Sequence, residues 1–178
     1  MRVQAVVLVA VIGALAACTV AGAGTMPAGG KIKVWVTPGL GAVDKIVITG
    51  AIGDYGTATT ITKSGKVDSN GNYVRIRLKQ GGFEVNSVAL NKKVNNAPPI
   101  MVNKTTCSFE FGGNGPVTLF NGTGRYAGIS GTIQIAEVFA GVGPRFKTGA
   151  KKGQCNLSNN AQPAAFYGSI TGTGTVSF

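Results

Sequence analysis

The chain has 178 residues, with 17 lysines and arginines against 6 acids, no histidine and a formal net charge of +11. Without histidine, Ser-His-Asp and Cys-His catalytic arrangements are excluded. No zinc site is expected either, because the two cysteines outside the N-terminal segment, Cys107 and Cys155, would rarely hold the metal alone. We predict no metal, no cofactor and a single domain, since the length is that of one compact unit.

The N-terminus has the pattern of an export signal. Arg2 precedes an apolar run over residues 5–17, which ends in small residues directly before Cys18. A charged region, an apolar region and a cleavage site follow one another in such signals, and the run is shorter than the roughly 20 residues that cross a bilayer. The Leu-Ala-Ala sequence before Cys18 also resembles a bacterial lipobox, in which the cysteine carries the lipid. We therefore predict an export signal over residues 1–17 and a membrane anchor on Cys18.

An ordinary secretory signal is the alternative, because an A-x-A pattern occurs at residues 21–23. Cleavage there would leave a secreted or periplasmic protein without a lipid. Residues 18–30 are mostly small, uncharged and rich in glycine, so we expect a flexible tether there. The folded domain is predicted over residues 31–178, and outside the cytoplasm in both cases.

Alternation of apolar and polar residues is the main structural signal of this domain. Ile32, Val34 and Val36, for example, alternate with two lysines and a tryptophan, and no window keeps a helical period without a glycine or proline. Period-2 patterns bounded by Gly, Asn and Pro are typical of strands. The chain is predicted to be almost entirely β, with strands over residues 31–36, 44–51, 57–62, 73–79, 83–91, 105–111, 117–120, 126–139, 150–156 and 166–178.

Turn signals separate these segments. The strongest is the Asn-Gly pair at residues 70–71, which favours a hairpin. Glycine-rich clusters predict further tight connections at residues 80–82, 112–116 and 121–124, and longer loops are expected over residues 91–103 and 140–149. Short strands at such regular spacing indicate a sandwich or a barrel.

A short internal echo favours the closed barrel. Residues 126–132 match residues 167–173 at a tyrosine, an isoleucine, a glycine and a threonine, and the other positions are small in both. A glycine at the same place in two strands predicts equivalent bends, as at the corners of a barrel.

Cys107 and Cys155 remain once Cys18 is assigned to the signal or the lipid. An even pair of cysteines in an oxidising compartment predicts one disulfide. Closing a loop of this length stabilises a fold by roughly 4 kcal/mol in the chain-entropy model. Two separate buried thiols are the alternative.

The segment over residues 122–132 carries a family resemblance. Its pattern is similar to the GTG-x-[YF]-x-G-x-x-G signature of the allene oxide cyclase/dirigent barrel superfamily, and residues 45–56 and 73–88 resemble earlier strands of that family. The resemblance covers roughly residues 46–178 and implies an eight-stranded antiparallel barrel with an apolar cavity; several plant members act on, or orient, small hydrophobic molecules. The signature residues are Gly122, Thr123, Gly124, Tyr126, Gly128 and Gly131.

No catalytic residue of that family can be assigned to a position here, so the catalytic residues are left unknown. Glu84 and Glu110 fall on the strand faces opposite phenylalanines and are expected to point to solvent. Glu137 lies in the apolar run 133–140 and either faces inward or pairs at the surface. An inward carboxylate would have a raised pKa and could serve as an acid. The remaining acids are placed at strand ends, Asp44 and Asp54, or in a turn, Asp68.

Several aromatic side chains could either line a cavity or fill a core: Trp35, Tyr55, Tyr73, Phe109, Phe111, Tyr126, Phe139 and Phe166.

The expected function is that of an exported, lipid-anchored barrel of the cell envelope that binds or scaffolds and holds a small hydrophobic ligand, without enzymatic activity. One alternative is a cyclase- or isomerase-like enzyme that acts on a hydrophobic molecule by shape and one inward acid. Another is a cationic protein that interacts with anionic lipids or polymers of the envelope. The cations are scattered in short clusters, so solvated strand faces also explain them, and no specific binding of nucleic acid is expected.

Overall fold

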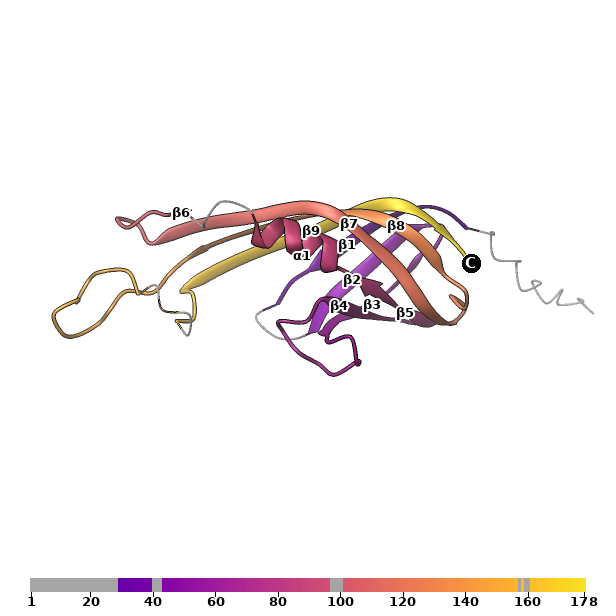
Figure 1. Ribbon diagram of the computed structural model, residues 1–178. Coiled ribbons are helices and arrows are strands. Elements are labelled where there is room, and N and C mark those ends of the chain that lie inside the picture. Colours follow the sequence, from indigo (N-terminus) through magenta and orange to yellow (C-terminus); the bar gives the residue numbers. More distant parts are fainter. Residues whose placement is uncertain (1–28, 40–42, 97–100, 157, 159–160) are drawn as a thin grey trace, which may run out of the picture.

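The computed structural model of the chain describes residues 29–39, 43–96, 101–156, 158 and 161–178 (Figure 1). The predictions for the export signal, for most of the tether and for Cys18 fall outside these residues. The elements within them are β1 (Gly29–Thr37), β2 (Val43–Gly50), β3 (Asp54–Ile61), β4 (Tyr73–Leu78), β5 (Gly81–Asn86), α1 (Val88–Asn95), β6 (Met101–Val102), β7 (Ser108–Gly124), β8 (Ser130–Val142) and β9 (Ala165–Ser177).

Eight of these strands form a closed antiparallel barrel, which confirms the predicted fold class. The strands follow the order β5-β4-β3-β2-β1-β9-β8-β7, and the pairing of β5 with the second half of β7 closes the sheet on itself. β1 begins at Gly29, opposite Ser177 of β9, so the last two residues of the predicted tether already belong to the sheet.

The period-2 pattern places one face of each strand inside the barrel. On β1, Ile32 and Val34 are buried whereas Lys31 and Lys33 are exposed. The same alternation buries a set of branched side chains from the other strands, among them Ile46, Ile48, Ile76, Val117, Leu119, Ile133 and Ile135. Branched side chains suit a pleated surface with one apolar face, so the core follows directly from the sequence pattern.

The structure of β7 differs from the prediction for two elements. Residues 105–111 and 117–120 were expected as two strands joined by a turn over the glycine cluster 112–116, but Ser108–Gly124 is one continuous strand. The glycines of this cluster allow α1 to pack closely on the strand instead. A side chain at Gly115 would meet Leu90 of α1, and one at Gly113 would meet Val94, so the cluster gives the helix room on the inner face of β7.

The helix α1 was not predicted, because residues 83–91 were expected as a strand and 91–103 as a loop. Its apolar signal is weak, since Leu90 is the one residue of its eight that is fully buried. Contacts outside the helix fix its start: the amide of Asn91 donates a hydrogen bond to the side-chain oxygen of Asn72 at 2.7 Å, and the Ser87 hydroxyl donates to the Asn72 carbonyl at 2.9 Å. Such long-range contacts override a weak local pattern.

Three strands continue past the barrel and form a projection that we call the tongue (Figure 1). It consists of β6, the first part of β7, the last part of β8, the first part of β9 and the loops between them. Residues 150–156 were predicted as a strand but form a loop with a single bridge between Arg145 and Cys155. The tongue leaves the barrel at the end opposite to Gly29 and Phe178.

The internal echo does not mark equivalent positions. Tyr126 is completely buried in the turn between β7 and β8, whereas Tyr167 is 64% exposed on β9. The prediction of equivalent bends is therefore wrong, although the barrel it favoured is correct. Among the described residues, no helix is long and apolar enough to cross a membrane.

Candidate functional site: a cavity inside the barrel

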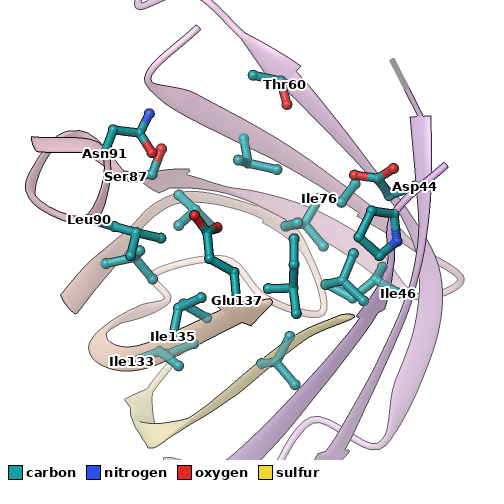
Figure 2. A pocket seen from close by; sticks show the side chains of 18 of the residues that line it. Asp44, Ile46, Thr60, Ile76, Ser87, Leu90, Asn91, Ile133, Ile135 and Glu137 are labelled. Atoms are coloured by element: carbon teal, nitrogen blue, oxygen red, sulfur yellow. The ribbon is translucent and has the colours of Figure 1, made fainter. Parts of the chain in front are cut away.

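The barrel interior is not filled by side chains. A cavity of about 380 Å³ lies within it and opens at the end from which the tongue projects. Its wall is mainly apolar, with Ile46, Ile76, Ile133, Ile135 and Leu90 among the lining residues (Figure 2). Ligand pockets in proteins range from about 300 to 1,000 Å³, so the space is large enough for one small molecule.

Glu137 is the most distinctive polar residue of this cavity. It lies on β8, opposite Gly113 of β7 and Ile170 of β9, at a position that alternation places on the inner face. Figure 2 shows its carboxyl group directed into the pocket. Burial raises the pKa of Glu137 above its ordinary value, because a charged carboxylate loses hydration there. Of the two predicted orientations, the structure shows the inward one.

No lysine or arginine lines the cavity, and within the described part of the chain the Glu137 carboxyl makes no hydrogen bond or ion pair. Among the other polar side chains of the wall, which include Thr60 and Ser69, three are engaged in hydrogen bonds. Asp44 accepts a hydrogen bond from the backbone N–H of Gly39 at 2.9 Å, and Ser87 and Asn91 bind Asn72 as described above. Glu137 is thus the wall group best placed to bind a molecule inside.

The opposite end of the barrel is closed around a buried carboxylate, that of Asp54. The Tyr126 hydroxyl donates to Asp54 at 2.7 Å, and the backbone N–H groups of Tyr55 and Gln80 donate to the same carboxylate at 2.7 and 3.0 Å. Asp54 is 5% exposed. Burial by itself raises the pKa of Asp54, but the hydrogen bonds from Tyr126 and from the backbone outweigh it, so the pKa lies below its usual value.

Two phenylalanines complete this closed end. Phe83 meets the Tyr126 ring edge to face at 6.0 Å, and Phe178 packs against it at 6.0 Å as well. Burial and the neighbouring carboxylate raise the pKa of the Tyr126 hydroxyl. The hydroxyl therefore stays protonated and acts as a donor.

The six signature residues lie at the end of β7, in the following turn with Tyr126 and at the start of β8, away from the cavity. A side chain at Gly122 would collide with the backbone of Tyr126, and Gly124 has a φ of +60°. The Thr123 hydroxyl donates to the Gly82 carbonyl at 3.2 Å and ties the turn to β5. The remaining two, Gly128 and Gly131, also have positive φ. In this protein the signature residues close the barrel and do not line its inner cavity.

The structure also places the other predicted residues. Glu84 points outward, as expected, and forms an ion pair with Arg75 at 3.1 Å. Glu110 is exposed, and Asp68 accepts a hydrogen bond in the turn before β4. The disulfide between Cys107 and Cys155 is present, with a Cα–Cα distance of 5.5 Å.

The aromatic residues divide between several roles, and one of the eight predicted candidates, Phe139, lines the cavity. Trp35 is 51% exposed, and Tyr55 is exposed as well. Phe111 and Phe166 stack with Phe139 along the tongue, and Phe109 stacks with Phe111. Within the described ranges, no cluster of three potential metal ligands occurs.

Sequence reasoning missed two parts of the site. The pairing of Asp54 with Tyr126 joins residues 72 positions apart, and no local pattern signals such a contact. The covering of the cavity by α1 was also missed; the glycines of the 112–116 cluster were its only signal, and they were interpreted as a turn.

No family model, curated protein or solved structure matches this chain. The resemblance to the allene oxide cyclase/dirigent superfamily therefore stays a prediction, and the functional argument depends on the geometry of the barrel.

Proposed function

We propose that the barrel binds one small, mostly apolar molecule that carries a hydrogen-bond donor. The observation behind the proposal is the cavity of about 380 Å³ with mainly apolar walls and the inward carboxyl group of Glu137, which has no hydrogen-bond partner among the described residues. Ligand sites combine a large apolar surface with a few well-placed polar groups. The cavity has both.

The charge of the wall restricts the class of ligand. Asp44 and Glu137 are acids, and no cation of the described residues lines the cavity. A carboxylate or phosphate inside it would therefore meet two acids and lose its hydration without compensation. A hydroxyl, an amide or an amine would instead donate to the Glu137 carboxyl. We therefore favour a neutral or cationic ligand over an anionic one.

Binding can be tested with N-phenyl-1-naphthylamine, a neutral apolar fluorophore with one N–H donor. We expect saturable binding, which Ile135→Phe lowers at least tenfold because the added ring occupies the cavity. Val47→Phe, on the outer face of β2 where Val47 is 48% exposed, is the matched control and should bind like the wild type. Since Ile135→Phe could disturb folding, Glu137→Gln is measured as well and should bind several-fold more weakly. Equal affinity of the fluorophore for the wild type and all three variants would refute the proposed binding site in the cavity.

Native mass spectrometry of the protein purified from its own host would identify the natural ligand. A non-covalent adduct of low mass that is absent from Ile135→Phe would give its chemical class. A wild-type protein without any adduct, together with no binding of the fluorophore, would contradict the proposal.

Glu137 also supports a second candidate, an acid-catalysed isomerisation or cyclisation of the bound molecule. Its pKa is raised, and a carboxyl group that keeps its proton at higher pH can act as a general acid. The test is chromatography of the identified ligand after incubation with wild type and with Glu137→Gln. Conversion by the wild type alone would support catalysis, and no conversion by either would leave a binding protein.

For its location, we propose an exported protein anchored through a lipid on Cys18, or a secreted protein without the lipid. Support comes from the order of charge, apolar run and small residues over residues 1–18. The intact mass of the mature protein distinguishes the two forms. Acyl mass on Cys18 would support the anchor, whereas an N-terminus beyond residue 21 would support ordinary cleavage.

A further inference from the structure

We propose that the tip of the tongue docks on an anionic lipid bilayer. The tip is defined as residues 102–107 and 143–156. It contains five exposed cations and no acid: Lys104, Arg145, Lys147, Lys151 and Lys152. The nearest acid along the described chain is Glu110, which lies outside the tip on β7.

The tip holds its charges on a fixed scaffold. The Cys107–Cys155 disulfide joins its two segments. Arg145 donates hydrogen bonds to the carbonyls of Thr105 at 2.5 Å and Gly153 at 2.6 Å, one in each segment. Charges on an ordered platform bind a surface without first losing the entropy of a flexible loop.

Aromatic groups beside the cations favour a bilayer over a purely polar polymer. The Lys151 ammonium lies 5.8 Å from the ring centre of Phe146 within the tip. Behind the tip, Phe109, Phe111 and Phe139 stack in sequence with ring centres 6.2 and 5.0 Å apart, and Phe166 follows Phe139 at 6.0 Å. Aromatic rings next to lysine and arginine suit the boundary between headgroups and acyl chains.

Docking of the tip would also place the mouth of the cavity relative to the membrane. The tongue projects from the open end of the barrel, while Gly29 and Phe178 lie at the closed end (Figure 1). The inner face of the tongue continues the inner face of β7 and β8, from Ile135 and Glu137 to Phe139. A docked tip would therefore bring the mouth of the cavity close to the membrane, from which an apolar molecule could enter.

The test compares two charge reversals of equal size in the full chain. Lys147→Glu/Lys151→Glu/Lys152→Glu changes the tip, and Lys31→Glu/Lys33→Glu/Lys45→Glu makes the same change on exposed positions of β1 and β2. Sedimentation is measured with vesicles of equimolar phosphatidylglycerol and phosphatidylcholine, and with phosphatidylcholine alone to account for binding by the apolar N-terminal segment.

We expect the tip variant to lose affinity for the anionic vesicles on the order of 100-fold and the β1/β2 variant to lose much less. Binding of the wild type should weaken as salt is added. Equal losses in both variants would mean that net charge alone attracts the vesicles, which would overturn the proposal. Binding to soluble polyphosphate but not to anionic vesicles would overturn it as well, in favour of a polymer.

A fluorescence measurement tests contact of the tip directly. Trp35 is the single tryptophan, so Trp35→Phe/Phe146→Trp carries one reporter, in the tip. Its emission should shift to shorter wavelength on anionic vesicles, and no shift would contradict insertion of the tip. Ile135→Phe, which blocks the cavity, should leave both readouts unchanged, so docking and ligand binding can fail independently.

Discussion

Carboxyl groups lie towards both ends of the barrel, and Asp54 at the closed end and Glu137 at the open end lie in opposite environments. At the closed end, Asp54 accepts hydrogen bonds from Tyr126 and two backbone N–H groups, and its pKa is lowered. At the open end, Glu137 faces an apolar cavity without such donors among the described residues, and its pKa is raised.

This difference contrasts a structural acid, Asp54, with Glu137, the acid that we propose to contact a ligand. A buried carboxylate whose oxygens are satisfied stabilises the fold, whereas one left without partners costs stability and persists where it has another use. The signature tyrosine belongs to the first kind of site. Three substitutions test this difference between the two carboxyl groups.

Asp54→Ala should destabilise the protein by about 3–4 kcal/mol, because it leaves the buried Tyr126 hydroxyl and two partly buried backbone donors without an acceptor. Urea unfolding monitored by circular dichroism measures the change. Glu110→Ala removes an exposed acid and is the control, with an expected change within about 0.5 kcal/mol. A similar loss of unfolding free energy in both variants would mean that the hydrogen bonds of Asp54 add no particular stability at the closed end.

Tyr126→Phe should cost about 1.5–3 kcal/mol at neutral pH, the range for a hydrogen bond to a charged group. Because the folded-state pKa of Asp54 is lowered, its contribution is present above the unfolded pKa and is lost as the pH falls through the folded pKa. Without the tyrosine donor the folded pKa rises, so this acid-dependent loss should become smaller. Unfolding free energies between neutral pH and pH 3 test this, and identical pH profiles would contradict the assignment.

Glu137→Gln should stabilise the protein slightly, by less than about 1 kcal/mol at pH 7.5 once solvent screening is allowed for. The raised folded-state pKa of Glu137 means that wild-type stability from this group is present below the unfolded pKa and is lost as the pH rises through the folded pKa. The advantage of the variant should therefore vanish near pH 4. Thermal unfolding of both proteins at pH 7.5 and near pH 4 measures this stability difference. A variant that is less stable than the wild type at pH 7.5 would indicate a structural role for Glu137.

Much of the fold follows from local patterns. The alternation around Ile32, Val34 and Val36 correctly predicted an inward apolar face, and the Asn-Gly pair at residues 70–71 marked the connection between β3 and β4. The even pair Cys107 and Cys155 predicted the disulfide. These signals are local or depend on simple counting, so a single sequence carries them.

The β class, the strand faces and the cysteine pair can therefore be predicted from the sequence. The tertiary structure sets the inward orientation of Glu137, because this orientation depends on the register of β8 against two other strands, and a shift by one residue would turn the side chain outward. It also decided that Asp54 meets Tyr126 and that α1 lies on Gly113 and Gly115. These contacts join segments that are distant along the chain, and they exist only once the pairing of β5 with β7 closes the barrel.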